Sequence, residues 1–403
     1  MRIAIWWEQD SWGGVDTHLL TLLCNWPDKN DQFVIFYNSD NQGMNRILST
    51  MKQLKTVSLV KFPSKAYLSS SLFTRVLLHF TLPLRFWFLK RRAQILISSQ
   101  GHFDALLIEN GGYPGSWGSL AALWSGSALA FKIRMLLVHH AAISRATFRF
   151  SFESLIDFCV QRWATDLVAV SRATRTTLIE RRGFLTEKNP IRVVHNGVDQ
   201  SLGENKAKFD LRINLKIPLN SFMVGMVGRI ERYKGQEDLI LALRELSPKQ
   251  LAKIVVVFVG GGEEKEIARL KAIALKIGVI SQIRFAGYVE GSSSMLMRQF
   301  NLLAMLTKDF EGFGLTIAEA MLVGTPVITT IVGAVPEFVS KEIAVMVSIE
   351  APEEIAEALL NIMQNPKSAL KRAKKAQLHI RKFSGKIMAK RFYRLLVTSG
   401  VSV

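Results

Sequence analysis

The sequence has little cysteine and no pattern typical of a metal site. Its 403 residues include two cysteines, Cys24 and Cys159, and seven histidines that form no H-x-x-x-H or Cys/His cluster. Two isolated thiols cannot supply a disulfide framework or a thiolate metal site. We therefore expect a protein of the reducing cytoplasm, and we find no residue spacing that would hold a metal or another cofactor.

Long hydrophobic runs are missing as well. The apolar stretch Met1–Trp7 is too short for a signal peptide and fits a first buried strand better. A second apolar stretch, Lys65–Arg92, is interrupted by basic and histidine side chains and broken at Pro83. A helix that spans a bilayer needs about 20 mostly apolar residues with few charges. The sequence therefore predicts no membrane-spanning helix in this stretch.

Acidic residues are absent from residues 41–103, which carry ten Lys and Arg residues. Residues 367–394 hold eleven more and again no acid, in a chain with a formal net charge of +19. Positive fields of this kind attract nucleic acid or an anionic membrane surface. The chain has no zinc-finger spacing, RNP-like aromatic pattern or helix-turn-helix spacing. We therefore expect no nucleic-acid partner.

The apolar content of Lys65–Arg92 favours the membrane as the partner. Aromatic residues such as Phe86, Trp87 and Phe88 are interleaved with cations there. That composition is typical of helices that lie in the headgroup plane. We expect a helix pair, with the basic residues 90–92 on lipid phosphates and the protein peripheral on the cytoplasmic face of the membrane. The alternative is a core helix with a basic, solvated face.

Most of the chain alternates between apolar strands and helices. With 49% hydrophobic residues it can bury the cores of two domains of about 200 residues. Fully apolar strands that alternate with helices indicate a parallel sheet covered on both faces. The pattern predicts strands at Arg2–Trp7, Phe33–Tyr37, Val57–Phe62, Asp104–Glu109, Arg134–Val138, Leu167–Val170 and Ile191–Val194, then at Phe222–Val227, Lys253–Val259, Gln282–Phe285, Asn301–Leu306, Pro326–Thr330 and Ala344–Val347.

We therefore predict an α/β fold of two Rossmann-like, doubly wound domains with a cleft between them. The amino-terminal domain is expected over residues 1–199, a polar linker over 200–220 and the carboxyl-terminal domain over 221–375. Residues 376–403 are expected to form basic helices, the last capped by Ser384 and returning to the amino-terminal domain. Ligands of doubly wound domains bind at the carboxyl ends of the strands.

One segment carries two glutamates eight positions apart across a glycine-rich turn. Glu311 precedes Gly312, Phe313 and Gly314, and Glu319 lies in the helix that follows. The first N–H groups of a helix lack partners and lie at the positive end of its dipole, so they suit a phosphate. Carboxylates on either side could bind hydroxyl groups. The segment therefore indicates a nucleotide-sugar site, and the alternative is an ordinary helix start with two solvated glutamates.

This segment resembles the E-x7-E signature of retaining GT-B glycosyltransferases, the glycogen-synthase-like and lipopolysaccharide-type group. The resemblance extends over nearly the whole chain and is weaker over residues 41–135. It implies metal-independent transfer of a sugar, with retention, from a nucleotide-diphosphate donor to an acceptor hydroxyl. It also implies that Glu311 binds the sugar near its anomeric carbon, that Glu319 binds the ribose and that the backbone of Gly312–Leu315 meets the phosphates.

A second motif follows the strand predicted at Phe222–Val227. Val227–Gly235 resembles the VGR-x4-KG motif of the same family, in which an arginine and a lysine hold the diphosphate. The matching residues are Arg229 and Lys234. Two fixed cations stabilise the charge that grows on a departing diphosphate without a metal, so the chemistry supports that role. The alternative is two solvated basic residues.

Two segments of the first half also match the family. Gly13-Gly14 follows the first strand and opens a helix, where glycine lets a backbone approach a pyrophosphate. The family loop usually reads Gly-Gly-x-Glu, and here Asp16 takes the fourth position; a plain turn is the alternative. Asn196–Asp199 resembles the segment that leads into the family's linker, and we expect a mostly structural role for it.

Histidines and one acid lie at two predicted strand ends. His139 and His140 follow the strand at Arg134–Val138, and in the family a histidine at this strand end lines the sugar pocket. We expect His139 to contact the transferred sugar or the acceptor hydroxyl, with His140 as the second candidate. Glu109, at the end of Asp104–Glu109, is a further candidate for acceptor contact. The alternative for His139 is a cleft-wall or core histidine.

Three further glycine-containing segments follow strands of the second half. Gly260-Gly261-Gly262 lacks the G-x-G-x-x-G spacing and precedes two glutamates, so we expect a tight turn. Gly287–Val289 resembles the family segment whose backbone touches the nucleobase, which makes Val289 a candidate for donor binding. Gly333–Glu337 resembles a family loop for which we expect a structural role.

Two other functions fit the same scaffold. A GT-B-fold nucleotide-sugar epimerase would share the fold, and an inactive membrane-bound scaffold would keep it without chemistry. The intact glutamate pair favours transfer, and the presence of Arg229 and Lys234 argues against an inactive scaffold. We therefore predict a hexosyltransferase-type enzyme that acts on a glycan or lipid-linked acceptor in the synthesis of lipopolysaccharide, O-antigen or exopolysaccharide.

Overall fold

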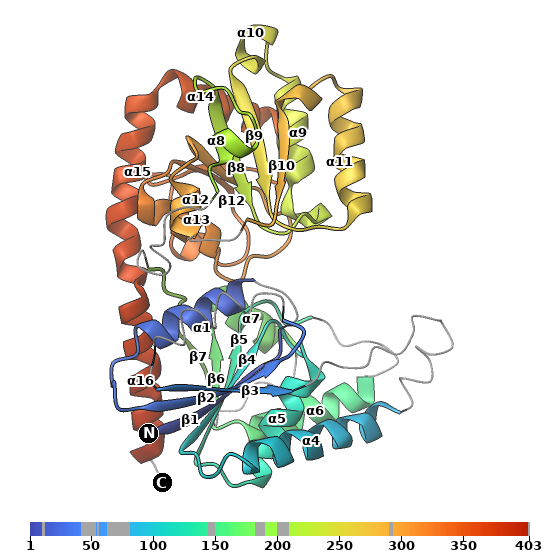
Figure 1. The fold of residues 1–403 in the computed structure, drawn as a ribbon, viewed down its shortest axis with the longest axis vertical. Coiled ribbons are helices and arrows are strands. Elements are labelled where there is room, and N and C mark those ends of the chain that lie inside the picture. The colour runs from blue at the N-terminus through green and yellow to red at the C-terminus, as the bar shows by residue number, and fades with distance from the viewer. Residues whose placement is uncertain are drawn as a thin grey trace. The chain divides into compact units, whose positions relative to one another are not determined.

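The computed structural model describes residues 1–9, 13–41, 54, 56–62, 81–143, 150–181, 190–199, 209–289 and 293–401. The chain divides into two compact units, Met1–Gly197 with Gly385–Val403, and Val198–Ser384 (Figure 1). Each unit is built around a parallel sheet of its own. Among the helices that the structure describes, none is long and apolar enough to cross a membrane.

The sheet of the first unit has seven strands in its described part, in the order β3-β2-β1-β4-β5-β6-β7. All neighbouring strands pair in parallel. The strands form where apolar residues run without interruption, and β4 is buried along its whole length. They are β1 (Arg2–Trp7), β2 (Gln32–Asn38), β3 (Val57–Phe62), β4 (Ala105–Asn110), β5 (Ile133–Val138), β6 (Asp166–Ala169) and β7 (Ile191–Val193).

Helices cover both faces of this sheet and bury two separate cores. On one face α1 (Gly14–Cys24) and α16 (Gly385–Val401) contribute Leu19, Leu22 and Phe392 to a core with the side chains of β1. On the other face lie α4 (Leu82–Ser98), α5 (Trp117–Ala128), α6 (Phe150–Trp163) and α7 (Arg172–Glu180). A parallel sheet with helices on both faces is the doubly wound arrangement that the sequence predicts.

The helix α4 has two apolar faces, and this corrects one expectation. Phe86 is only 2% exposed and stacks on Trp124 at 5.6 Å between ring centroids, so it belongs to the core and not to a membrane surface. Its neighbours Trp87 and Phe88 are exposed. Pro83 lies in the first turn of α4, where proline is tolerated, rather than breaking a helix. The first part of the expected helix pair lies outside the described residues.

The second unit has six described strands, in the order β10-β9-β8-β11-β12-β13, all parallel. They are β8 (Phe222–Val227), β9 (Ile254–Val259), β10 (Ile283–Gly287), β11 (Leu302–Met305), β12 (Val327–Thr330) and β13 (Val345–Val347). The longer helices are α9 (Gln236–Arg244), α11 (Glu264–Lys276), α13 (Leu315–Val323), α14 (Pro352–Gln364) and α15 (Pro366–Ile380). The shorter ones are α8 (Leu211–Asn214), α10 (Pro248–Leu251) and α12 (Ser293–Met297). The two-domain α/β prediction is confirmed.

The expected domain boundaries shift at two places. The second unit starts at Val198, and the part of the expected linker that the structure describes contains α8, with Leu211 and Ile217 buried. The polar composition of this segment predicted a linker and gave no sign that these two side chains are buried. At the other end, α15 stays in the second unit because its alanine-rich face packs on α13, so the return to the first unit begins only at Gly385.

In each sheet the strand order reverses at one point. In the first unit β1 lies between β2 and β4, and in the second unit β8 lies between β9 and β11. The connections that leave β1 and β4, or β8 and β11, therefore depart in opposite directions and leave room at the carboxyl ends of the strands. Ligands of doubly wound sheets bind at this position.

Candidate active site

The second unit joins two of its predicted site residues at this reversal point. Glu311 follows β11, and Lys234 follows β8, which is its neighbour in the sheet. The Lys234 Nζ lies 2.9 Å from Glu311 Oε2, and both side chains are about one fifth exposed. The Thr307 hydroxyl donates to the same carboxylate oxygen at 3.2 Å. A cation and a carboxylate that solvent reaches are therefore fixed at one place on the sheet edge.

Arg229 is the second cation at the carboxyl ends of these strands. Its guanidinium pairs with Glu231 at 2.9 Å and donates to the Tyr233 hydroxyl at 3.2 Å. The side chain is largely exposed. Its backbone is held more firmly, because Gln236 donates to the Arg229 carbonyl at 3.0 Å. Arg229 can therefore turn toward an anion without unfolding its loop.

The helix start between Glu311 and Glu319 is confirmed. Gly314 is the cap residue of α13 and has a φ of +90°, a left-handed conformation that favours glycine. Phe313 is buried and stacks on Phe338 with ring centroids 4.8 Å apart, which anchors the turn. The first turn of α13 holds no acidic residue that would satisfy its N–H groups. The turn therefore keeps the features of an anion site.

Two glycine loops brace these residues. A Cβ on Gly333 would lie 2.3 Å from the carbonyl oxygen of Glu311, and Ala334 N–H donates to that oxygen at 2.9 Å. A Cβ on Gly260 would lie 1.9 Å from the carbonyl oxygen of Gly228, beside Arg229. These close approaches explain why the chain carries glycine here, and they fit the structural roles expected for both loops.

The remaining donor-side candidates lie along the same edge. Glu319 is half-buried one helical turn after Leu315, the first residue of α13. Val289 follows β10, whose last residue, Gly287, accepts a hydrogen bond from Gly260 N–H at 2.8 Å. The structure thus aligns Val289 with the carboxyl ends of β9 and β8, on the side away from Glu311.

In the first unit the glycine loop after β1 leads directly into α1, which begins at Gly14. The N–H of Gly13 donates to the Asp16 carboxylate at 2.5 Å, so that donor is already used inside the protein. Asp16 is buried, and burial raises the pKa of its carboxyl to about 7. Asp16 therefore acts on its own helix start, and any phosphate contact here falls to the donors that follow Gly13.

Glu109 and His139 form a buried pair. Glu109 is the second-last residue of β4, and His139 follows β5, the neighbouring strand. His139 Nε2 lies 2.6 Å from Glu109 Oε2, which is a hydrogen bond. Glu109 is fully buried and His139 nearly so. Of the two, Glu109 is therefore the more deeply buried, and His139 is the side chain closer to solvent. His140 is half-buried beside them.

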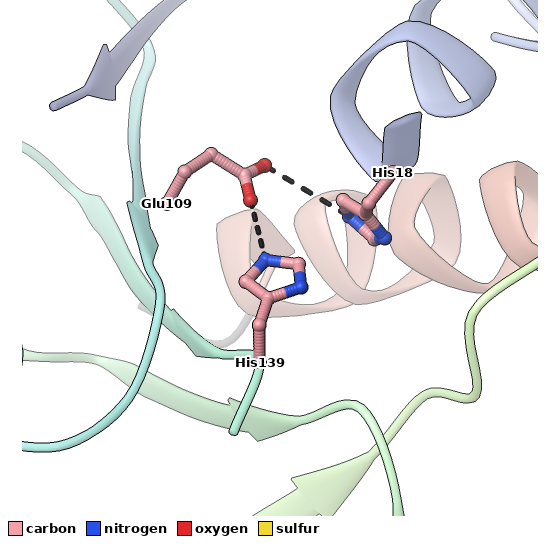
Figure 2. A group of neighbouring side chains, drawn as sticks. All are labelled: His18, Glu109 and His139. Atoms are coloured by element: carbon pink, nitrogen blue, oxygen red, sulfur yellow. Dashed lines mark hydrogen bonds and ion pairs between the residues drawn. The ribbon is translucent and has the colours of Figure 1, made fainter. Parts of the chain in front are cut away.

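His18 completes this group, and the sequence analysis missed it. It lies on the buried face of α1, and Figure 2 shows its ring and that of His139 on different oxygens of Glu109. His18 Nε2 lies 3.8 Å from Glu109 Oε1, and His18 Nδ1 lies 2.9 Å from Asn196 Oδ1. The only sequence signal is a histidine among the apolar positions of α1. Asn196, expected to be structural, thus also orients a member of the group.

Burial controls the ionisation of these three side chains. Removal from water disfavours every charged form. It raises the pKa of Glu109 to about 6, lowers the pKa of His18 to about 4 and lowers the pKa of His139 to about 3. Near neutral pH both imidazoles are therefore neutral, and Glu109 carries the only full charge of the group.

His18, Glu109 and His139 are also residues that could hold a metal, because one ligand atom of each lies within 4.8 Å of the others. Zinc ligands at about 2.0–2.1 Å in tetrahedral geometry lie roughly 3.3 Å apart. The 2.6 Å separation of His139 Nε2 and Glu109 Oε2 is shorter and is that of a hydrogen bond. The residues thus fit a proton-linked group better than a metal centre.

Comparison with known proteins extends these observations. Residues 207–379 match the family described as "Glycosyl transferases group 1", and residues 12–202 match "Glycosyltransferase Family 4". The chain is 30% identical over 201 residues to a D-inositol 3-phosphate glycosyltransferase of Corynebacterium glutamicum, which covers 48% of each protein. The chain spans about half the length of the curated relatives it matches.

Two solved structures share the fold over nearly the whole chain. Anabaena HepE, solved in complex with UDP and glucose, has a TM-score of 0.76 at 19% identity and covers 99% of this chain and 100% of its own. The sucrose-phosphate synthase of Thermosynechococcus elongatus has a TM-score of 0.73 at 16% identity and covers 100% of both chains. At these identities the likeness shows a common two-domain, Rossmann-like GT-B fold.

Proposed function

Because this chain belongs to the group 1 glycosyltransferases, we propose that it transfers a sugar from a nucleoside-diphosphate donor to an acceptor hydroxyl, with retention and without a metal ion. The observation that carries the proposal is the Lys234–Glu311 pair beside the start of α13, which has no side-chain cap and no acidic residue in its first turn. It supplies a cation, a carboxylate and N–H donors at one strand-order reversal. That HepE was solved with UDP and UDP-glucose makes a UDP-sugar the first donor to test.

The proposed roles follow from charge. Lys234 and Arg229 stabilise the negative charge that grows on the departing diphosphate. Glu311 accepts hydrogen bonds from sugar hydroxyls, and Glu319 accepts them from the ribose. The bond between C1 and the phosphate oxygen breaks, the acceptor oxygen bonds to C1 on the same face, and the acceptor proton passes to the departing phosphate oxygen. This sequence needs no covalent bond to Glu311, which supports its role as a hydroxyl ligand.

A donor panel tests the activity. Purified protein is screened with nucleoside-diphosphate sugars by thermal shift, and stabilising donors are then assayed for nucleotide release with glycan and lipid-linked acceptors. We expect release to depend on acceptor and to persist in EDTA. Interconversion of donor sugars without release would favour an epimerase. Activity lost with chelator and restored by a divalent cation would contradict the metal-free part of the proposal.

We further propose that the first unit binds an anionic membrane surface and meets its acceptor there. The exposed side of α4 carries Leu84, Trp87, Phe88 and Ile95. The adjoining helix α6, whose Phe152 and Trp163 rings contact Phe86, exposes Leu155 and Phe158. Arginines lie among these residues, with Arg91 over the Trp87 ring at 6.0 Å and Arg162 over the Phe158 ring at 4.1 Å. Apolar side chains edged with cations suit the headgroup region.

Vesicle co-sedimentation tests this surface. We expect binding to phosphatidylglycerol vesicles, little binding to phosphatidylcholine, and weakening with salt, because the electrostatic attraction is screened. The double variant Trp87→Ser/Phe88→Ser should bind less. Its control is Ile213→Ser/Leu219→Ser, which removes two apolar side chains of the second unit that are even more exposed. Equal loss in both variants, or equal indifference to both lipids, would contradict the proposal. An acceptor at this surface suits cell-surface glycan synthesis.

A further inference from the structure

Three buried polar atoms of the His18–Glu109–His139 group lack a hydrogen-bond partner among the described residues. They are His18 Nε2, Glu109 Oε1 and His139 Nδ1. Buried polar atoms in native proteins are nearly always paired, so such a concentration calls for a physical account. Two of the three, His18 Nε2 and Glu109 Oε1, face each other at 3.8 Å.

The tautomers of this group follow from its hydrogen bonds. Asn196 Oδ1 accepts from His18 Nδ1 at 2.9 Å, so the neutral His18 ring leaves Nε2 as an acceptor. Glu109 Oε2 accepts from His139 Nε2 at 2.6 Å, so the neutral His139 ring leaves Nδ1 as an acceptor. His18 Nε2 and Glu109 Oε1 are then two acceptors with no hydrogen between them. One added proton, with the two atoms moving from 3.8 Å to hydrogen-bond distance, would satisfy both atoms and cancel the buried charge.

We propose that His18 is a positioning residue, which receives that proton together with Glu109 Oε1 and so keeps Glu109 Oε2 an acceptor for the Nε2–H of His139. Without His18, a proton that enters the group would have to reside on the carboxyl of Glu109. The carboxyl could then donate to His139 Nε2 and force the other tautomer. Any consequence for the transferred sugar rests on the proposed function. It would act through His139, which is the group member that lies nearest to solvent at the strand ends.

The neighbours that pack on His18 from α16 and from the segment after β7 cannot take up the proton. From α16 the ring of Phe392 packs on His18 at 5.5 Å, and from the segment after β7 the neutral amide of Asn196 meets it. Among the described residues, Glu109 and His139 are the titratable groups that act on His18, and the carboxyl of Glu109 faces His18 with Oε1 and His139 with Oε2. Because two coupled groups titrate as a unit, the proton belongs to the His18–Glu109 pair.

The test reads the rings directly in the ligand-free protein. Selective 15N labelling of the seven histidines distinguishes protonated from bare ring nitrogens, and His18→Gln and His139→Gln assign the two signals. We expect His139 to keep protonated Nε2 and bare Nδ1 from pH 8 down to pH 5. In His18→Phe the His139 signal should convert to protonated Nδ1 as the pH falls. His18→Gln, whose amide can donate to Glu109 Oε1, should restore the wild-type tautomer.

A matched control and a second readout complete the test. His102→Gln changes an exposed histidine and should leave the His139 signals unchanged. In the transfer assay, the acidic limb of kcat/KM should move to higher pH in His18→Phe and not in His18→Gln. An unchanged His139 tautomer in folded His18→Phe would overturn the proposal, as would a bound metal on His18 in the purified protein. If the His139 tautomer shifts in His18→Phe as expected but the protein shows no transfer activity, only the proposed function is contradicted.

Discussion

The ion pair between Lys234 and Glu311 makes the sharpest test of the proposed site, because stability and turnover respond to it on different scales. Lys234 Nζ lies 2.9 Å from Glu311 Oε2, and each side chain is about one fifth exposed. Partly solvated pairs of this kind have coupling energies of about 1 kcal/mol or less. If the pair were only structural, removing it would cost the protein no more than that.

A catalytic role predicts a larger effect on the barrier. Lys234→Met keeps the aliphatic stem and removes the cation that would stabilise the departing diphosphate. Loss of one such preorganised group raises barriers by about 2–4 kcal/mol, or roughly 30- to 1,000-fold in kcat. Glu311→Gln keeps the size of the side chain and should likewise lower kcat more than donor affinity. The double variant should be little worse than the worse single variant, because the two groups act on one ligand.

The assay pairs urea unfolding of the free protein with kcat at saturating donor. The control is Arg232→Met, since Arg232 is a mostly exposed cation two residues before Lys234 that pairs with Glu266. It should change neither quantity. The reasoning is refuted if Lys234→Met retains kcat within about threefold, or if the control variant loses as much activity.

Four further outcomes are expected. Glu319→Gln should weaken binding of free nucleoside diphosphate in calorimetry more than it lowers kcat. Gly333→Ala should destabilise the protein by more than about 2 kcal/mol in urea unfolding, because φ is +53° and the new Cβ would meet the Glu311 carbonyl at 2.3 Å; an unchanged midpoint would contradict this. Phe86→Ala should cost about 3–5 kcal/mol, whereas Phe88→Ala should cost less than about 0.5 kcal/mol. Burial raises the pKa of Asp16 from 3.8 to about 7, so its contribution to stability is full below pH 3.8 and is lost as the pH rises through 7; Asp16→Asn should remove that part of the pH dependence.

Much of the fold could be predicted because its signals are local. The described strands follow apolar runs that the sequence shows directly, and β8 and β1 have the predicted bounds. The start of α13 at Leu315 and its end at Gly324 follow from glycine conformations that neighbouring residues require. For the same reason the glutamate and lysine motifs could be placed beside the correct strands before any contact between them was known.

Side-chain environments could not be predicted in this way, because distant segments decide them. Phe86 and Phe88 have the same chemistry and lie two residues apart, yet only contact with α5 and α6 buries the first. The boundary at the end of the second unit could not be predicted for the same reason. It depends on which core the apolar side of α15 and α16 meets, and the basic composition of both helices gives no sign of this.

The sequence by itself determined the fold class, the strand positions and the donor-side motifs of the second unit, since these depend on patterns within a few residues. Only the tertiary structure brought His18, Glu109, His139 and Asn196 together from α1, β4, the end of β5 and the segment after β7. Periodicity shows that such residues are buried but not which of them meet. Their ionisation follows from that meeting, because the loss of water and the neighbouring groups set the pKa of a buried side chain.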